Sequence, residues 1–342
     1  SDNSPDNSSS SYSSSPHPLD NISGLVLWLN ARNIDGNNNS SLSDGDVVSE
    51  WSDLSGNGND AEVFGGNPVS QISGDNSSVY FSGTDSFKLK ALPNDLGMTD
   101  GDTNADGYDI FMVFKHEKDD AGFLIGADLG HHEIHANLSA GNDGVRFIPN
   151  YSPPYIDKSS SVKNTEAILN TRVQDGGGYL SLNGEHSDSV NNSSLSSNNG
   201  VLYLGKRVGT NVYNYKGSIS EILIFSRPLT ISSRAKVYSY LSSKWNLTST
   251  VDSDGDGIVD ASDPFPTDPS KWISFPQALR DNASDNFTAM NGLALWLDAS
   301  NVDGDKNSSL SDGDAVGEWK DLSGNGNDLT QTLDSTKPSL AN

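Results

Sequence analysis

The sequence predicts an all-β fold: an antiparallel jelly-roll β-sandwich with one closing helix, then an acidic loop that serves as a linker and part of a second sandwich. Three observations predict it. Short apolar runs, separated by Gly, Asn, Asp and Ser, recur from residue 24 to residue 225 and are typical of short antiparallel strands. One later stretch has the three- and four-residue spacing of a helix. The opening passage also returns near the end of the chain, which indicates a second copy of the same module.

The strands are expected where apolar and β-branched residues cluster between turn residues. These ranges are 24–29, 78–81, 109–114, 122–127, 133–138, 145–148, 167–173, 179–182, 201–204 and 218–225. Their short lengths and near-regular spacing favour an antiparallel sandwich over a parallel sheet with crossover helices.

One helix is expected at about residues 232–245. Apolar side chains recur there at Ile231, Ala235, Tyr238, Leu241 and Trp245. Because these positions share one helical face, we expect that face to lie against a sheet. Trp28 and Trp51 lie inside apolar runs and are expected in the core.

The internal repeat divides the chain. Residues 24–60 align with residues 292–328 at a constant offset of 268, with nine differences in 37 positions. We therefore expect a Ser-rich flexible linker (1–20), one whole sandwich (21–247), a calcium-binding linker (248–272) and the N-terminal part of a second module (273–342). Since the second copy lacks counterparts of residue 78 onward, we expect it to be loosely ordered or to pair with strands from elsewhere.

Composition limits the function. Acidic residues number 46 against 21 basic ones, a net charge of −25, which disfavours nucleic acid and anionic membranes and suits calcium binding. No apolar run is long enough for a transmembrane helix, so no membrane insertion is expected. The absence of cysteine excludes disulfides and thiolate metal sites. Such a chain is typical of a secreted or cell-surface bacterial protein, and its start at Ser1 predicts a piece of a longer, multidomain one.

The strongest candidate site is the acidic loop, residues 252–263. Oxygen-bearing side chains occupy positions 1, 3, 5, 9 and 12 of a calcium loop: Asp252, Asp254, Asp256, Asp260 and Asp263. Gly257 stands at position 6, where such loops turn sharply, and Ile258 at position 7 would offer its carbonyl oxygen. Five carboxylates this close would repel one another without a cation. The sequence therefore predicts Ca²⁺ here.

With the Pro-rich stretch 264–269 behind it, the acidic loop resembles a thrombospondin type 3 repeat. It departs from an EF-hand by ending on Asp263 instead of Glu and by lacking helices on both sides. The resemblance implies a calcium-stiffened spacer between extracellular modules.

Residues 22–247 resemble the concanavalin A-like lectin/glucanase superfamily in its bacterial laminin-G-like form. The resemblance rests on five passages: Gly24–Leu29, Trp51–Asp60, Tyr179–Gly184, Gly217–Phe225 with Arg227–Leu229, and the helix with Lys244 and Trp245. It implies a jelly-roll sandwich of two antiparallel sheets. It says less about function, because this fold serves lectins, hydrolases and spacers alike.

Other candidates are weaker. Asp35, Asn37, Asn39 and Asp46 have partial calcium-loop spacing, mirrored at residues 303–314, as do Asp100, Asp102 and Asn104. For the first loop, a turn built on Asx hydrogen bonds is an equal alternative. His131, Glu133 and His135 would share one face of a strand, where they either contact a metal or glycan or simply face solvent. Tyr151 and Tyr155, in loop-like surroundings, are candidates for stacking on sugar rings.

No catalytic pattern is present. The glucanase branch needs two carboxylates on one strand face, whereas Glu221 has no acidic neighbour at that spacing. We therefore expect no enzyme activity, but a calcium-binding, lectin-like module that binds a glycan or cell-surface polysaccharide, beside neighbouring domains of the same protein. Two alternatives remain open: a structural spacer without a ligand, and an accessory domain of a secreted polysaccharide-degrading enzyme.

Overall fold

The computed structural model describes residues 18–19, 21–98, 107–117, 119–127, 132–136, 143–149, 155–174, 176–184, 188–191, 200–207, 213–270 and 294–341. The chain divides into two compact units, residues 1–272 and 273–342. The Ser-rich segment 1–17 lies outside the described residues. The expected flexible linker nevertheless ends before residue 20, because Leu19 is 4% exposed and belongs to the core of the first unit.

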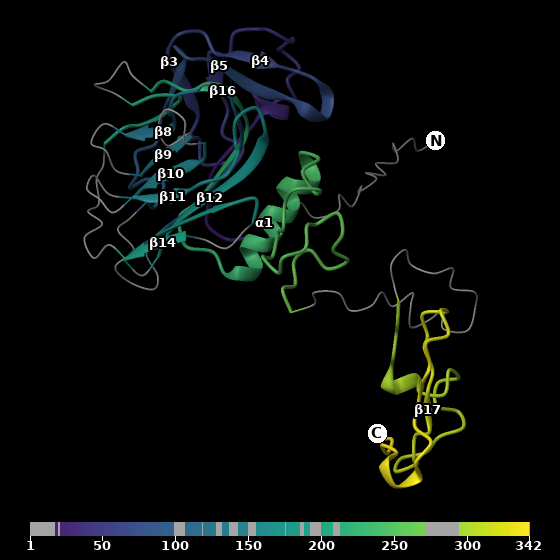
Figure 1. Ribbon diagram of the computed structural model, residues 1–342. Helices are drawn as coiled ribbons and strands as arrows, with labels where there is room; N and C mark the ends of the chain where they lie inside the picture. The colour runs from purple at the N-terminus through teal and green to yellow at the C-terminus, as the bar shows by residue number, and fades with distance from the viewer. Residues whose placement is uncertain are drawn as a thin grey trace, which may run out of the picture. The chain divides into compact units, whose positions relative to one another are not determined.

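The first unit is an all-β sandwich of two antiparallel sheets (Figure 1). The first sheet has the order β14 (Asp188–Asn191), β13 (Gly177–Leu182), β12 (Glu166–Gln174), β7 (Tyr108–His116), β16 (Lys216–Phe225), β5 (Ser78–Ser82) and β4 (Val69–Gln71), with β1 (Leu25–Asn30) also on β16. β1 and β5 share one edge of β16: β5 pairs with its first half and β1 with its second. This shared edge brings the start of the module beside its end.

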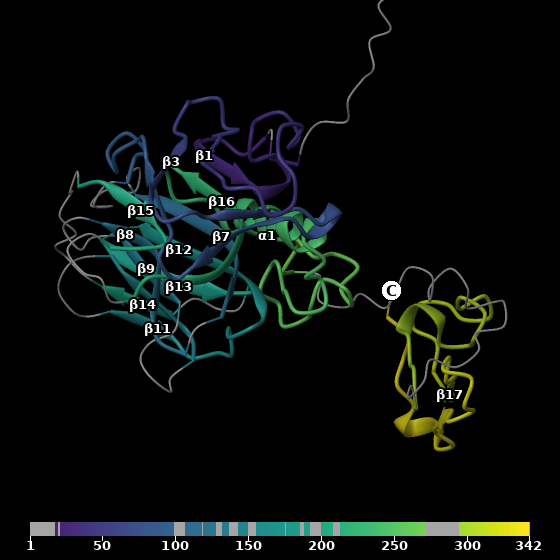
Figure 2. The same cartoon turned by 90° about the horizontal axis from the view of Figure 1, so that it is seen from above.

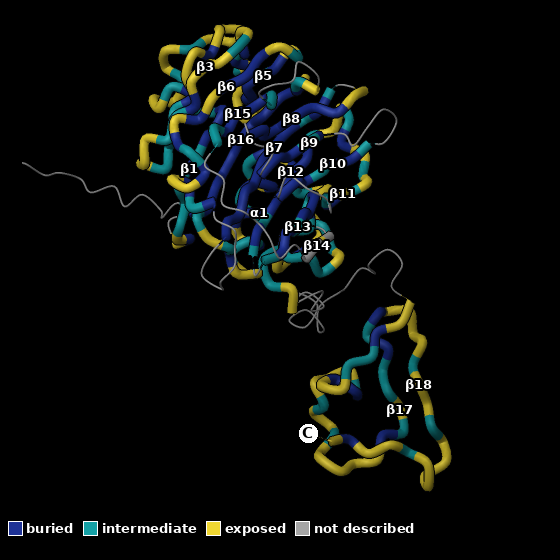
Figure 3. The backbone as a smooth tube through the Cα atoms, turned by 90° about the vertical axis from the view of Figure 1, so that its left-hand side faces the viewer, coloured by how far each residue is buried: buried dark blue, intermediate teal, exposed yellow. Residues whose placement is uncertain are grey.

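The second sheet faces the first across the core. Its order is β11 (Ile156–Lys158), β10 (Val145–Ile148), β9 (Glu133–Ala136), β8 (Gly122–Ala127), β15 (Leu202–Leu204), β6 (Ser86–Leu89), β3 (Ala61–Gly65) and β2 (Glu50–Trp51). Phe81 of the first sheet meets Phe87 of the second edge to face, with ring centroids 5.8 Å apart. The strands form the buried interior of the unit in Figure 3. Burial of apolar side chains from both inner faces is the main stabilising contribution to such a sandwich.

One α-helix is present among the described residues of the first unit: α1 (Ile231–Lys244), which packs on the outer face of the first sheet (Figures 1 and 2). Thr230 caps its N-terminus by accepting a hydrogen bond from the Ser233 amide. Tyr238 meets Phe111 of β7 edge to face, at 5.3 Å between ring centroids. The expected buried face is confirmed at Ala235, Tyr238, Leu241 and Trp245, each at most 3% exposed.

Two details differ from the sequence-based expectations. Ile231 is 63% exposed, because it occupies the first turn, where the helix has not yet reached the sheet. Trp51 is fully buried as expected, but Trp28 is only half-buried and packs at the margin of the core.

The second unit contains a short hairpin of β17 (Glu318–Trp319) and β18 (Leu329–Thr330), a bridge between Ala315 and Ser339, and 3-10 turns at Ala299–Asn301 and Asp334–Thr336. Its small core consists of Val302, Val316 and Leu340. Leu295 is 43% exposed. Trp296, in contrast, is 6% exposed, and its backbone amide donates to Asp321 Oδ1 over 2.9 Å. In the described parts of both units, no helix is long and apolar enough to cross a membrane.

Candidate functional site

The acidic loop follows α1 directly and is packed against the sandwich. Val251 is fully buried in the core, and the Asp252 amide donates to the carbonyl oxygen of Asn183 over 3.0 Å. Gly184 allows this approach: a Cβ atom there would lie 1.6 Å from the Asp252 carbonyl oxygen. The sequence predicts a linker at residues 248–272, but the described part of this segment belongs to the first unit.

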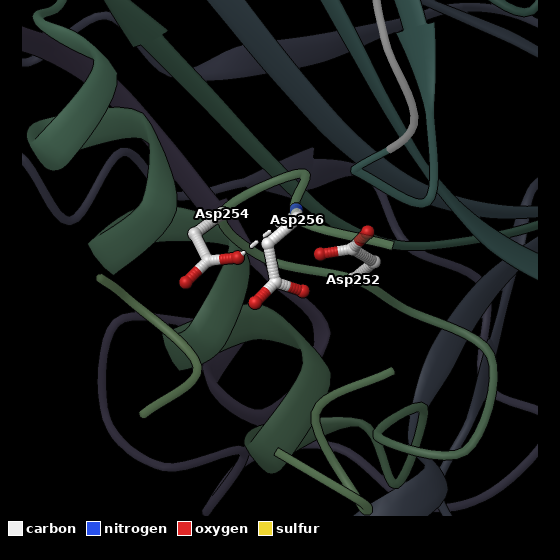
Figure 4. A group of neighbouring side chains, drawn as sticks. All are labelled: Asp252, Asp254 and Asp256. Atoms are coloured by element: carbon white, nitrogen blue, oxygen red, sulfur yellow. Dashed lines mark hydrogen bonds between the residues drawn. The ribbon is translucent and has the colours of Figure 1, made fainter. Parts of the chain in front are cut away.

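The backbone of the loop gathers three carboxylates. Asp252 accepts hydrogen bonds from the amides of Gly255 (2.8 Å) and Gly257 (2.7 Å), which fold the chain into a tight turn. Gly257 has φ = +99°, a conformation that favours glycine. As a result, carboxylate oxygens of Asp252, Asp254 and Asp256 lie within 4.8 Å of one another. Figure 4 shows the three side chains beside each other on one turn of the loop.

Three oxygens in the loop are buried without a hydrogen-bond partner. They are Oδ2 of Asp254, Asp256 and Asp263. Burial, followed by the neighbouring Asp256 carboxylate, raises the pKa of Asp254 to about 6. Burial also raises the pKa of Asp263, and the charges of Asp256 and Asp260 add to the effect. Buried carboxylate oxygens are normally paired or bound to a metal, so this oxygen set fits a hard divalent cation such as Ca²⁺.

Asp260 lies apart from the three gathered carboxylates of the acidic loop. Its Oδ1 accepts from the Ser253 amide (2.8 Å), while its Oδ2 accepts from the hydroxyls of Ser253 and Ser242. Ser242 lies on α1, so Asp260 ties the acidic loop to the helix. It is not among the three residues whose oxygens gather within 4.8 Å, although its spacing predicted a ligand. Ile258 donates its amide to Asp256 Oδ1 over 2.8 Å, which keeps it next to the predicted cation site.

The loop of residues 35–46 has the geometry of the Asx-turn alternative. Asp35 Oδ1 accepts from the amides of Asn37 and Asn39, and its Oδ2 accepts from the amide and hydroxyl of Ser41. Burial alone would raise the pKa of Asp35, but the hydrogen bonds from Ser41 outweigh it and lower this pKa to about 2.

Two other predicted ligands in the loop of residues 35–46 also accept hydrogen bonds from backbone amides. Asn39 Oδ1 accepts from the Ile34 amide, and Asp46 Oδ2 accepts from the Ser43 amide. Asp303 in the second unit repeats the pattern with Asp305, Asn307 and Ser309. The oxygens therefore stabilise the turn through the chain's own donors. The candidates Asp100, Asp102 and Asn104 lie outside the described residues.

Strand β9 places Glu133 and His135 on one face, as its alternation predicts. Glu133 is 1% exposed; its Oε1 lies 2.9 Å from Arg207 Nε and its Oε2 lies 3.8 Å from His135 Nε2. The ring of His135 packs on Phe123, with centroids 4.1 Å apart. These contacts make the face a packed ionic cluster and not a solvated strand surface.

Of the remaining candidates, Tyr155 is half-buried, and the Arg146 guanidinium lies 5.1 Å from its ring centroid. Arg146 also forms a two-point ion pair with Asp157, at 2.6 and 2.7 Å. Tyr155 is therefore already stacked by a protein cation on one face. His131 and Tyr151 lie outside the described residues.

Sequence reasoning missed a cluster around Glu221. This carboxylate is 1% exposed and accepts hydrogen bonds from Nε1 of Trp28 and of Trp245, both over 2.6 Å. Lys244 donates to both of its oxygens, at 2.8 and 2.7 Å, and Tyr240 donates over 3.2 Å. Lys244 also lies within 6 Å of the ring centroids of Trp28, Tyr240 and Trp245. A lone Glu followed by the apolar run Ile222–Phe225 was the sequence signal, because its partners lie on other elements.

Comparison with known proteins finds similarity at the level of structure. No protein family matches the chain, and no curated protein matches its sequence. Domain 4 of the extracellular GH43 arabinanase AbnA from Geobacillus stearothermophilus, solved with arabinotriose, is 18% identical, with a TM-score of 0.41; the match covers 59% of this chain and 99% of that domain.

Two further structures are similar to this chain. Trypanosoma rangeli sialidase is 13% identical with a TM-score of 0.43, and the match covers 64% of this chain and 33% of the sialidase. The binding domain of botulinum neurotoxin serotype D/C is 14% identical with a TM-score of 0.45, and the match covers 65% of this chain and 52% of that one. At these identities and TM-scores, we base the proposed function on the side chains of this chain alone.

Proposed function

We propose that the first unit is a calcium-stabilised, non-catalytic sugar-binding module of an extracellular bacterial protein. One observation carries the calcium part: three buried carboxylate oxygens, on Asp254, Asp256 and Asp263, have no hydrogen-bond partner. A bound cation would satisfy Asp254 and Asp256, whose carboxylates gather with that of Asp252 within 4.8 Å, and would remove the repulsion among them. Since the loop is packed against the core, binding would stabilise the whole unit and not only a linker.

The site has a route for the ion. A hollow of about 310 Å³ lies between the acidic loop and α1, and Asp254, Gly255 and Tyr238 are among its lining residues. The affinity expected of an extracellular calcium module is on the order of 10⁻⁴–10⁻³ M, which suits a protein outside the cell.

The absence of catalysis is part of the proposal. Glu221, a buried acidic side chain of β16 beside α1, accepts hydrogen bonds from two indoles, one ammonium and one hydroxyl. Both oxygens are thus occupied by the protein's own donors, which leaves no free carboxylate to attack a substrate or transfer a proton.

Calorimetry and thermal unfolding of the full chain test the calcium site. We expect calcium at a hundredfold excess over Kd to stabilise the first unit by about 2.7 kcal/mol relative to EDTA. Asp254→Asn and Asp256→Asn should abolish this stabilisation. Asp35→Asn, in the hydrogen-bonded turn, is the matched control and should retain it. Identical melting in calcium and EDTA, without binding heat, would refute the calcium site.

A further inference from the structure

Two hollows lie on either side of the Tyr240 ring in the first unit, outside the acidic loop. The first, of about 560 Å³, is lined by Trp28, Arg32, Asn33 and Asn38 as well as Tyr240 and Lys244. The second, of about 530 Å³, includes Ser239, Ser243 and Thr267 with the same Tyr240 and Lys244. Because the two hollows share Tyr240 and Lys244, they are called the groove together, and each is within the size range of small-molecule sites.

The aromatic walls of this groove are held in place. Trp28 directs its indole N–H inward to Glu221 over 2.6 Å. The Tyr240 hydroxyl donates to Glu221 over 3.2 Å and accepts from Lys244 over 2.9 Å. Both side chains are half-buried, so their polar ends are satisfied inside while their ring bodies line the hollows. Rings fixed in this way can bind a ligand without losing further rotational freedom.

The polar residues of the groove are amides. Asn33 Oδ1 accepts from the Asn38 backbone amide over 2.6 Å. Neither the Asn33 side-chain nitrogen nor the Asn38 side-chain amide makes a hydrogen bond to the described residues, and Asn38 is exposed. The Asn33 nitrogen can therefore donate to a hydroxyl group of a ligand, and the Asn38 amide can both donate to and accept from one.

The charges of the first hollow are compensated. Lys244 is neutralised by Glu221, at 2.7 Å. Arg32 stacks on Trp245, 4.7 Å from the ring centroid, and lies 3.4 Å from the Asp75 carboxylate. Its NH2 group also donates to the carbonyl oxygens of Asp75 and Lys244. The first hollow, beside Trp28, therefore disfavours a charged ligand, whereas the second hollow is also lined by the exposed Lys236.

We propose that this groove binds a segment of a neutral glycan, with one sugar ring on Trp28 and the chain passing Tyr240. A sugar ring combines an apolar C–H face, which suits an aromatic ring, with hydroxyls that suit amides. This inference rests on the proposed sugar-binding function and assigns that function to one place and one class of ligand.

The internal repeat supports this assignment independently. Six groove residues fall within the repeated passage, and three of them differ between the copies: Asn30, Arg32 and Asn38 correspond to Asp298, Ser300 and Lys306. Only six of the other 31 positions differ. The Trp is the same in both copies, whereas the polar residues around it change. The differences therefore concentrate on the polar residues around Trp28; Trp296, at 6% exposure in the second unit, presents no comparable open ring there.

Binding of polysaccharides to the full chain in calcium tests the groove. Laminarin, xylan and mannan serve as neutral probes, and alginate and polygalacturonate serve as acidic ones. Asn33→Asp keeps the acceptor for the Asn38 amide but removes the side-chain donor. Asn38→Lys places there the residue that Lys306 provides at the same positive φ in the second copy. Each change should weaken neutral-glycan binding about fivefold or more without changing the melting temperature.

Phe64→Ala is the matched control, because Phe64 is an exposed aromatic residue on the other sheet. It should bind the neutral glycan as the unchanged chain does. Unchanged glycan binding in both the Asn33→Asp and the Asn38→Lys variants would refute the groove as the binding site. It would not refute the proposed sugar-binding function itself. Binding of acidic glycans alone would refute the ligand class. No binding to any probe would refute the proposed sugar-binding function together with the groove.

Discussion

The Glu221 carboxylate lies 2.6 Å from the indole nitrogen of Trp28, although the two residues are 193 positions apart in the chain. This contact joins β1 to β16, and Lys244 and Trp245 add the end of α1 to the same carboxylate. A single buried charge therefore connects the first strand, the last strand and the closing helix of the sandwich.

Replacing Glu221 by Gln should lower the free energy of unfolding of the first unit by about 3–5 kcal/mol, because the Lys244 ammonium would remain buried without its counter-charge. Guanidinium unfolding followed by Trp fluorescence measures this loss. Lys244→Met in the same chain should recover part of it. Lys90→Met, which breaks an ion pair with Asp60 at 37% exposure of the lysine side chain, should cost less than about 1 kcal/mol. Equal losses for Glu221→Gln and Lys90→Met would contradict this account.

Asp109 should make stability depend on pH. Burial raises its pKa to about 6, although Leu229 and Asn170 donate hydrogen bonds to it at 2.6 and 2.8 Å. Because the folded pKa exceeds the unfolded value of about 3.9, the stabilisation from protonated Asp109 is complete below about pH 4. It is lost as pH rises through 6. A shift of about two pKa units corresponds to about 3 kcal/mol.

The comparison of Asp109→Asn with the unchanged chain isolates this effect. The free energy of unfolding of each protein is measured at pH 4.5, 5.5 and 7 in saturating calcium. The difference between their free energies of unfolding should change by about 2 kcal/mol across this range, because unfolded Asp109 is already mostly ionised at pH 4.5. Parallel pH profiles would show that Asp109 does not titrate there.

Asp35 should stabilise its turn without binding calcium. Asp35→Ala removes an acceptor of four hydrogen bonds from the loop and should lower stability by about 1 kcal/mol. The number of calcium ions bound, measured by calorimetry, should stay the same. A loss of one bound ion per chain would instead identify Asp35 as a ligand.

The repeated passage should differ in hydrogen exchange between its two copies. Leu27 and Leu29 lie in β1, which pairs with β16, so their amides should exchange slowly. Leu295 and Leu297 belong to no strand in the described part of the second unit, so their amides should exchange much faster. The Trp28 and Trp296 amides each donate to an Asp side chain and should not show this contrast. Peptides of both regions can be followed in one mass-spectrometric experiment on the full chain. Equal protection at low protein concentration would contradict the expectation.

The local sequence pattern was sufficient to predict most of the fold and the acidic loop. Strands such as β8 and β10 have the predicted bounds, since short apolar runs between turn residues form strands wherever a sheet accepts them. Short, polar strands such as β4 and β11 were not predicted, because their hydrogen bonds and not their side chains define them. The convergence of Asp252, Asp254 and Asp256 follows from spacing alone, as one tight turn brings alternate residues together.

The sequence by itself determined the repeat, the sandwich class, the helix and the acidic loop, because each depends on residues close together in the chain. Tertiary structure decided what the same residues do in each copy. Leu27 is fully buried in β1, whereas its counterpart Leu295 is 43% exposed and in no strand. The two passages are nearly identical, so the difference comes from β16, which offers Leu27 an edge to pair with and a core to enter. A strand needs a partner for its backbone hydrogen bonds, and local sequence cannot supply one.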